Sequence, residues 1–354
     1  MTFVSVTARS AVLRLVGAMV VPTSTLATAG LTVQAPIHAQ ALQGATLPTL
    51  RLPDESAGLD GIVRALIAAF DHVDILALGE DHGQGRDSDL RIALVRHPEF
   101  AKKVRSIVVE FGSASHQPTL DRYLRGEDVP FAQVEQVWKS VRWLSNGPIS
   151  PIYPDFFAAV REVNLKLPAD ERIRVYGGDP GPPDEKNRDA FAVSLLKAHV
   201  LQQAGKALVL YGAAHFYRTA GDVGDLLTGA GGGIVQRLEV DYPGRTFAVI
   251  PVGSQPKADP PVSGILVSDY LKFDRALKTQ VRPVLVSLAR SPFRDFTAEE
   301  FVGGKLMNCR AAKRLPDDCV SVFKGSSLTL GQMADAAVYF GGGAEVRAKT
   351  EPVR

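Results

Sequence analysis

The chain lacks any concentration of charge of one sign. Its 354 residues include 40 Lys and Arg and 38 Asp and Glu. Arg9 and Arg14 lie in the first 41 positions, which hold no acid, so the remainder carries 38 basic and 38 acidic side chains. A balanced chain without a basic run has no electrostatic footprint for DNA or RNA. We therefore expect no nucleic-acid partner.

Long apolar runs are also missing. The most apolar stretch near the N-terminus, Ala11–Val21 (AVLRLVGAMVV), is far shorter than the roughly 20 residues of a membrane span. It follows Arg9, contains Arg14 and precedes the small-x-small sequence Ala39-Gln40-Ala41, a pattern typical of an export signal. We predict that residues 1–41 are a signal peptide and that the mature protein is periplasmic or extracellular, with no transmembrane span.

Cysteine is scarce: Cys309 and Cys319 are the two in the chain. No CxxC pattern or Cys/His cluster accompanies them, so nothing in their spacing indicates zinc. In an oxidising compartment this spacing fits a local disulfide, and the alternative is a pair of unlinked thiols. The disulfide prediction depends on the export prediction.

What the chain does have is the composition of a globular protein, with 45% hydrophobic and 22% charged residues. No linker or internal repeat divides residues 42–354, which we expect to form a single domain. Apolar residues at helical spacing predict helices at Leu59–Phe70, Ser88–Arg96, Pro154–Leu165 and Arg188–Ala204, the last closed by Gly205. Short apolar runs predict strands at Ile75–Leu78, Ser106–Val109, Ile173–Tyr176, Ala207–Tyr211, Ile234–Val240, Phe247–Val252, Val284–Leu288 and Ala336–Phe340.

Alternating strands and helices predict the fold class. We expect an α/β protein whose central sheet is mostly parallel, with helices on both faces and hairpin-like connections among the later strands. The glycine-rich stretch Gly229–Gly233 is predicted to be a loop. Its glycines lack the spacing and the following helix of a phosphate cradle, so we expect no nucleotide site there.

Ionisable residues follow four successive predicted strands, each in a glycine-containing turn. They are Glu80 and His82, then Glu110, then Asp179, then His215. Taken singly, such residues have ordinary explanations, since an acid after a strand often caps the next helix. Ligands of open α/β sheets, however, bind beyond the carboxyl ends of parallel strands. The shared position predicts one cleft that contains all five side chains.

Two kinds of chemistry fit these residues. In the first, His82, Glu110 and His215 hold a divalent metal ion, and Glu80 or Asp179 acts as general base or orients a ligand. In the second there is no metal, and a carboxylate-bonded histidine activates water against an ester or amide. No GxSxG or catalytic-cysteine pattern supplies another nucleophile. Water is the expected nucleophile in both.

Two motifs at this edge carry a family resemblance. Gly79-Glu80-Asp81-His82 and Gly212-Ala213-Ala214-His215 resemble the paired Gly-x-x-His motifs of the Tiki and TraB families, and Glu110 matches their intervening glutamate. The order is also similar to the haem-binding ChaN group and to erythromycin esterases, in which a Trp-containing helical region follows, as Trp138 and Trp143 do here. The resemblance covers about Leu59 to Arg218, and the closest likeness is to exported bacterial proteins of this type.

The resemblance implies a Tiki/ChaN/erythromycin esterase-like fold with a pocket at the paired motifs. The leading hypothesis is a hydrolase of ester, lactone or peptide bonds in a small-molecule or peptide substrate. The alternative is a protein that binds haem or another small ligand, with Tyr211, Tyr217 or His215 as axial ligand. A scaffold without chemistry of its own is the third. Two residues separate Gly79 from His82, fewer than in the esterase motif, so erythromycin specificity is not expected.

The export prediction can be tested on the protein from its native host. Cleavage after Ala41 would give a mature chain that starts near Leu42, because the small residues before that bond suit signal peptidase. Intact-mass analysis of the protein recovered outside the cytoplasm should show this shorter chain. Retention of residues 1–41 would contradict export and would weaken the disulfide prediction with it.

Overall fold

The computed structural model describes residues 55–82, 85–145, 152–219, 231–252, 283–289, 291–298, 307–309, 319–321 and 325–340. All of them belong to the second of the two units into which the chain divides, Thr46–Arg354. The predicted signal peptide lies outside the described residues. Among the described helices, none combines the length and the apolar character needed to cross a membrane.

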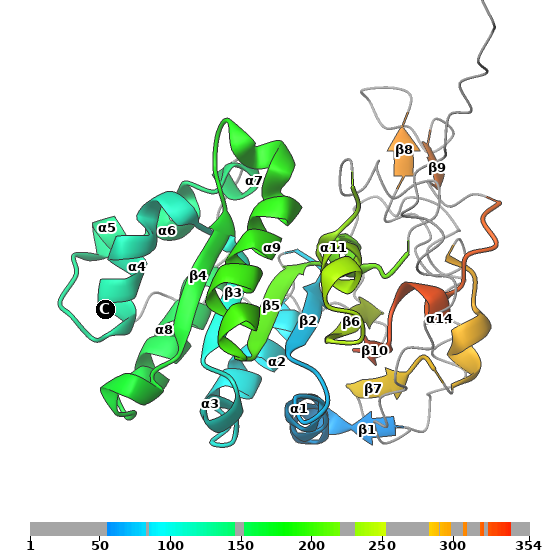
Figure 1. The fold of residues 1–354 in the computed structure, drawn as a ribbon, viewed down its shortest axis with the longest axis horizontal. Helices are drawn as coiled ribbons and strands as arrows, with labels where there is room; N and C mark the ends of the chain where they lie inside the picture. The colour runs from blue at the N-terminus through cyan, green and yellow to red at the C-terminus, as the bar shows by residue number, and fades with distance from the viewer. Residues whose placement is uncertain are drawn as a thin grey trace, which may run out of the picture. The chain divides into compact units, whose positions relative to one another are not determined.

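An eight-stranded sheet runs through the described part of the chain (Figure 1). Its order is β1-β7-β10-β6-β2-β5-β3-β4, and the six strands from β10 to β4 are parallel. Strand β7 is antiparallel to β10 and to β1. The strand bounds are β1 Glu55–Ala57, β2 Ile75–Glu80, β3 Ser106–Ser113, β4 Arg174–Asp179, β5 Ala207–Gly212, β6 Thr246–Val252, β7 Val284–Ser287 and β10 Ala336–Tyr339. This is the predicted α/β class with a mostly parallel sheet.

Helices cover both faces of this sheet. Those longer than a single turn are α1 Gly58–Ala69, α2 Gly85–Arg96, α4 Gln117–Leu124, α8 Ile152–Asn164, α9 Arg188–His199 and α11 Ile234–Asp241. Short helical turns are α3 Phe100–Lys103, η2 Ala114–His116, α5 Phe131–Val134, α6 Gln136–Lys139, α7 Arg142–Ser145, η3 Ala169–Glu171, η4 Asp184–Asn187, η5 Leu201–Gln203, η6 Ala213–Phe216, η8 Pro292–Asp295 and α14 Leu330–Met333. Figure 1 shows α9 and α11 in front of the sheet.

Side chains alternate between the two faces along each central strand, as the pleat requires. In β2, Leu76 and Leu78 join the apolar cluster under α1, α2 and α8, whereas Ile75 and Ala77 join the one under α9 and α11. Every residue of β2 is buried. A parallel strand covered on both faces therefore reads as a continuous apolar run, which is why the short runs in the sequence predicted these strands well.

Three local predictions were wrong, and two of them concern the same segment. Ile234–Val240 is not a strand but most of helix α11, which buries Ile234, Val235 and Leu238 at helical spacing. The glycine-rich stretch before it is therefore followed by a helix, contrary to expectation. A short apolar run rich in β-branched residues fits a strand and a buried helix equally well, and packing under the sheet decided between them.

The third error concerns the end of α9. This helix stops at His199, and the turn η5 (Leu201–Gln203) replaces its predicted last turn. Ala204, not Gly205, takes the left-handed conformation, with φ of 50°. The chain then enters β5 at Ala207, three residues later.

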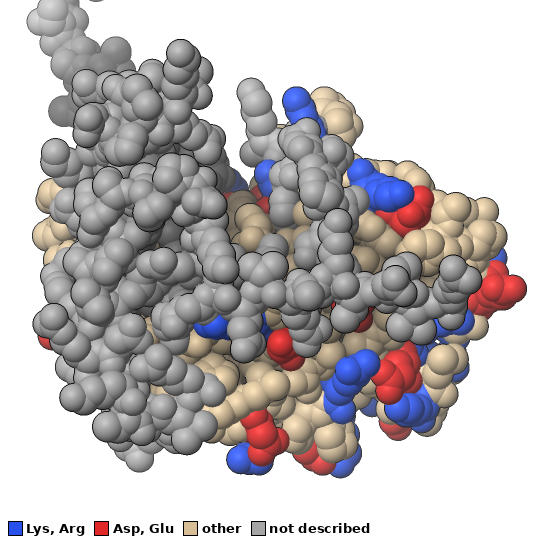
Figure 2. Space-filling model, turned by 180° about the vertical axis from the view of Figure 1, so that it is seen from behind, with Lys and Arg blue, Asp and Glu red and all other residues tan. Residues whose placement is uncertain are grey.

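Surface charge is mixed on the face seen in Figure 2. Blue and red side chains lie next to one another over the described surface of that view, with no broad area of one colour. Several of these charges form exposed ion pairs, such as Lys103 with Asp71 at 2.6 Å and Arg96 with Glu162 at 2.8 Å. Exposed pairs of this kind contribute little to stability. Positive and negative side chains are therefore balanced locally on this face, as they are in the sequence as a whole.

The two cysteines lie opposite one another in a separate two-stranded sheet. Strand β8 (Met307–Cys309) pairs antiparallel with β9 (Cys319–Ser321), and the register places Cys309 opposite Cys319. Directly opposed residues of antiparallel strands have Cα atoms about 4.5–5.5 Å apart. That separation falls inside the range that a disulfide spans. The pairing of the backbone supports the disulfide, which stays a prediction.

The disulfide prediction concerns both redox state and stability. If Cys309 and Cys319 are linked, unreduced protein unfolded in denaturant should show almost no reaction with a thiol-specific label. Replacing both by Ser should lower the free energy of unfolding of this segment by about 2–3 kcal/mol, the chain-entropy value for a loop of this length. Two labelled thiols per unreduced chain would show that the bond does not form.

Candidate functional site

The predicted residues come together because three neighbouring strands bring them to one edge of the sheet. Glu80 is the last residue of β2, Glu110 lies in β3, and His215 lies in η6, the turn that follows β5. Strand β5 lies between β2 and β3 in the sheet. Parallel strands end at the same edge, so side chains from residues 30 or more apart in sequence meet above β5.

Glu110 lies at the centre of this group and is buried, with 1% of its surface exposed. Its Oε1 accepts a hydrogen bond from Arg188 Nη1 at 2.5 Å and lies 3.5 Å from His215 Nε2. Its Oε2 accepts the backbone N–H of Gly212 at 2.8 Å and lies 3.8 Å from His82 Nε2. One carboxylate therefore faces both histidines.

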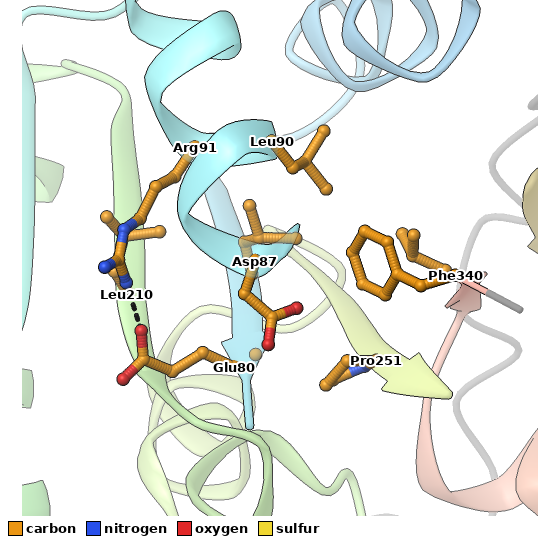
Figure 3. A pocket seen from close by; sticks show the side chains of 10 residues that line it. Glu80, Asp87, Leu90, Arg91, Leu210, Pro251 and Phe340 are labelled. Carbon is orange, nitrogen blue, oxygen red and sulfur yellow. Dashed lines mark hydrogen bonds and ion pairs between the residues drawn. The ribbon is translucent and has the colours of Figure 1, made fainter. Parts of the chain in front are cut away.

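Glu80 orients the imidazole of His82 through its Nδ1 atom. His82 Nδ1 and Glu80 Oε1 are 2.9 Å apart, which leaves Nε2 on the Glu110 side of the ring. Glu80 is buried and is itself fixed by Arg91, which contacts its Oε2, and by the hydroxyl of Tyr153, which donates to Oε1 at 3.2 Å. Figure 3 shows the pair of Arg91 and Glu80. The His82 side chain is 44% exposed, whereas Glu80 is buried. The imidazole is therefore open to solvent although the carboxylate that holds it is not.

His215 is held in the same manner on the other side of Glu110. Its Nδ1 lies 2.5 Å from Asp189 Oδ1, and its ring packs edge-on against Tyr211. The side chain is only 16% exposed, and Asp189 is buried at the start of α9. The site thus contains two histidines, each with a carboxylate at Nδ1 and with Nε2 facing Glu110.

Both glutamates stay ionised at neutral pH. Burial by itself raises the pKa of Glu110, but His215, His82 and Arg188 outweigh it and hold that pKa far below its usual range. Burial likewise raises the pKa of Glu80, and Arg91 together with His82 more than reverses this, so the net direction is down. Charges of opposite sign at short distance explain both shifts.

The two histidines are shifted upward, one much more than the other. Burial disfavours the imidazolium of His215, but Glu110 and Asp189 outweigh burial and raise the pKa of His215 to about 10. For His82 burial again acts downward, and Glu80 with Glu110 raises the pKa above its ordinary value. At neutral pH His215 is an imidazolium, while His82 is the histidine that can lose its proton.

The fifth predicted residue is placed differently. Asp179 ends β4, the edge strand, and its Oδ1 accepts the N–H of Gly181 at 2.8 Å, which closes its own turn. The structure thus brings Glu80, His82, Glu110 and His215 together, while Asp179 closes the turn after β4 and its charge acts on Tyr211, the ring that packs on His215. Trp138 is buried and stacks on Phe157, so it belongs to the core.

Sequence reasoning missed three charged partners of the site: Arg91, Arg188 and Asp189. Arg91 is on α2, and the adjacent Arg188 and Asp189 open α9. None follows a strand directly, so the strand-end signal did not include them. Asp189 and Arg188 do begin a predicted helix, and charged residues at that point could have been examined as candidates. Their partners, however, lie 26 and 78 residues away along the chain.

Glycine is required where the backbone passes beside the site. A Cβ on Gly212 would lie 2.8 Å from His82 Nε2 and 3.6 Å from Glu110 Oε2. A Cβ on Gly178 would lie 1.9 Å from the hydroxyl of Tyr211, the ring that packs on His215. Contacts of 2.8 and 1.9 Å do not occur at a Cβ, so Gly212, the first residue of the second motif, leaves the space that the His82 ring occupies.

A divalent metal does not fit the arrangement of His82, Glu110 and His215. Both oxygens of Glu110 already accept hydrogen bonds, one of them from a guanidinium, and a metal ion would add further positive charge beside Arg188. Among the residues that the structure describes, no group of three or more His, Cys, Asp and Glu side chains is arranged to hold a metal ion. The negative charge of Glu110 is already balanced by Arg188 and by the imidazolium of His215.

Haem does not fit the three predicted axial ligands either. Tyr211 is fully buried, Tyr217 is 5% exposed, and His215 Nε2 faces Glu110 from a mostly buried ring. An axial ligand needs a donor atom that an extended planar group can approach. Both tyrosines are buried, and His215 Nε2 is already directed at Glu110.

Comparison with known proteins supports the fold and goes no further. The chain is similar to a Bacillus cereus protein, with a TM-score of 0.50, 12% identity and coverage of 81% of this chain and 92% of that one. It is similar to a mutant erythromycin esterase in its open conformation, with a TM-score of 0.50, 12% identity and coverage of 83% and 96%. The haem-binding ChaN of Campylobacter jejuni gives a TM-score of 0.37, 13% identity and coverage of 56% and 87%.

At such low identity the two similarities with a TM-score of 0.50 show a shared erythromycin esterase-like α/β fold, and fold alone does not imply function. No protein-family model matches the chain, and no curated protein matches it. The predicted resemblance to the fold of the esterases is confirmed. The link to Tiki proteins stays a prediction.

A single methyl group tests the geometry of the site. The backbone at Gly212 (φ −53°) tolerates Ala. In Gly212→Ala the new Cβ would clash only with the His82 ring and would displace it. We expect the protein to fold and the NMR pKa of His82 to fall toward its ordinary value, because the ring moves away from Glu110. Gly61→Ala, in α1 with open space around it, is the matched control and should leave His82 unchanged.

Proposed function

We propose that this protein is a hydrolase of ester, lactone or peptide bonds that uses water as the nucleophile. The observation that carries the proposal is the pair of carboxylate-bonded histidines facing one buried glutamate, with unequal exposure and unequal pKa values. Titratable groups whose environments separate their pKa values are typical of an acid and a base that work together. Metal is not required in this scheme, because the site's own cations balance its carboxylates.

His82 is the general base in this proposal. In the neutral ring Nδ1–H donates a hydrogen bond to Glu80. The lone pair of Nε2 is therefore free to take a proton from water. The ring is the exposed one of the two, so water and a substrate carbonyl can both approach Nε2. The oxygen of that water bonds to the carbonyl carbon while its proton passes to Nε2.

His215 is the electrostatic and acid partner. Its imidazolium bonds to Asp189 through Nδ1 and presents Nε2–H on the side of Glu110. In the tetrahedral intermediate the charge on the former carbonyl oxygen is stabilised by this cation. As the intermediate collapses, the leaving oxygen or nitrogen takes the Nε2 proton of His215. Solvent then removes the proton from His82 and returns one to His215, so the net reaction consumes one water.

Glu110 acts through the two histidines. Fixed by Arg188 and by the Gly212 amide, its carboxylate stabilises the imidazolium of His215 before the reaction and the imidazolium that forms on His82 during it. A preorganised charge of this kind costs no reorganisation at the moment of proton transfer. Because Glu110 lies between the two imidazole rings, its carboxylate stabilises the positive charge on both of them.

Variants of the first motif test these roles. Glu80→Gln keeps the shape but weakens the support for an imidazolium at His82, and we expect kcat to fall on the order of 10²–10⁴-fold with the fold intact. His82→Ala should lose at least as much, whereas His97→Ala, at a half-buried position just after α2, is the matched control and should not change kcat. A panel of carboxylic esters, lactones and peptides measures this, and full activity of Glu80→Gln would contradict the proposal.

The pH dependence follows from the two histidines. His82 must be neutral, so kcat/KM should rise as pH increases through its raised pKa. His215 must be protonated, so kcat/KM should fall as pH passes its pKa of about 10. A bell-shaped profile with an alkaline optimum is therefore expected, and it should be the same with and without a chelator. Activity that disappears on chelation, or returns only with added metal, would rule out the metal-free scheme.

We also propose that the hydrolase acts outside the cytoplasm, in the periplasm or medium. The N-terminal leader pattern and the opposed cysteine pair support this, because a disulfide persists in oxidising compartments. Fractionation of the native host, with the mass of the recovered chain, tests the location independently of activity.

A further inference from the structure

A small cavity lies beside Glu80. It is bordered by α2 and by the carboxyl ends of β2, β5, β6 and β10 (Figure 3). Leu90, Pro251 and Phe340 supply apolar walls. Two carboxyl groups border this cavity, those of Glu80 and Asp87. Glu80 is explained by His82 and Arg91, whereas Asp87 has no part in the scheme above.

Asp87 is tied to the turn that carries the first motif. It lies in the first turn of α2 and is 6% exposed, and its Oδ2 accepts the backbone N–H of Asp81 at 3.0 Å. Asp81 stands between Glu80 and His82 in sequence. The bond therefore fixes the backbone between the residue that supports the base and the base itself.

Among the described residues, no cation forms a hydrogen bond or ion pair with Asp87. Arg91, one turn further along α2, is committed to Glu80, and Arg86 donates to the backbone oxygen of Phe340 at 3.0 Å. Burial, Asp81 and Glu80 together raise the pKa of Asp87 well above its ordinary value. An ionised Asp87 would be a second anion beside Glu80 in an apolar cavity, which is costly.

We infer that Asp87 is a positioning residue that acts as an uncharged acid, holding the Glu80–His82 turn through the Asp81 amide without competing with Glu80 for Arg91. The inference rests on the proposed function, since it assigns a role in keeping His82 in place as the base. A neutral carboxyl group offers both an acceptor for the Asp81 amide and a hydroxyl donor. Asparagine offers the same two groups with nearly the same shape and cannot ionise.

The groups that face Asp87 come from a small number of elements. Glu80 and Asp81 belong to the end of β2, and Arg91 belongs to α2. The lining residues from β5, β6 and β10 are apolar: Leu210, Pro251, Val338 and Phe340. Any pH dependence specific to Asp87 therefore reflects its own proton, with the two acids and Arg91 as its electrostatic neighbours.

The first arm of the test measures stability and needs no substrate. An acid whose pKa is raised on folding contributes stability that is fully present below its unfolded pKa and is lost as pH rises toward its folded pKa. The side chain in Asp87→Asn cannot ionise, so this variant does not lose that stability as pH rises. The melting temperature of Asp87→Asn should therefore exceed that of the wild type by an amount that grows as pH rises above about 4, the ordinary pKa of an aspartate. Asp89→Asn makes the same substitution on the same helix but outside the cavity, and it should show no such trend.

The second arm measures the site. Asp87→Asn should retain most of kcat and leave the NMR pKa of His82 unchanged, because the Asp81 amide keeps its acceptor. Asp87→Ala removes the acceptor, so the His82 pKa should move and kcat should fall on the order of tenfold to a hundredfold, the usual cost of a small misplacement, with little change in KM. Asp89→Asn again serves as the control that should match the wild type.

The outcomes separate this inference from the proposed function. A melting-temperature difference that does not grow with pH would show that Asp87 is ionised and would overturn the inference, as would an Asp87→Asn variant as inactive as Asp87→Ala. If the wild type hydrolyses none of the substrates, the proposed function fails, while melting and the His82 pKa still decide the state of Asp87. Should Asp87→Ala fail to fold, the pH trend and the His82 pKa of Asp87→Asn remain decisive.

Discussion

The arrangement of the site depends on one buried anion, the carboxylate of Glu110. A carboxylate removed from water is costly unless charges and hydrogen bonds replace its hydration. Arg188, the Gly212 amide and the two imidazoles supply that replacement from α9, β5, η6 and the turn after β2. Because each partner comes from a different element, the charge of Glu110 holds the carboxyl ends of the central strands in one geometry.

Inequality between the histidines follows from the same anion. Both rings have a carboxylate at Nδ1 and Glu110 at Nε2, but His215 is nearly enclosed and His82 is open on one side. Enclosure strengthens the electrostatic effect of Glu110 and Asp189, so the pKa of His215 rises much further than that of His82. Similar local chemistry in two environments thus gives one proton donor and one proton acceptor. The shorter contact of His215 with its Nδ1 carboxylate and its smaller exposure together create that division of roles.

Support for the site is arranged in successive layers. Glu80 orients His82, Arg91 neutralises Glu80, and Asp87 holds the turn between them through the Asp81 amide. Glu80 and Glu110 each have an arginine as ion-pair partner and Asp87 has none, which is why a neutral acid suits that position. Close approach of these layers needs backbone without side chains at Gly212 and Gly178. Charge pairing and small backbone positions together set how near His82 and His215 come to Glu110.

From the sequence alone, the parallel strands, most helices and the meeting of Glu80, His82, Glu110 and His215 could be predicted. Buried strands read as apolar runs, and strand ends share one edge, so a local pattern was enough. Helix α11 was mistaken for a strand because its short β-branched run suits both and only packing under the sheet distinguishes them. Arg91, Arg188 and Asp189 could not be assigned to the site, nor could the two pKa values be separated. Those features arise from distances and burial between segments far apart in the chain, which exist only once the tertiary structure has formed.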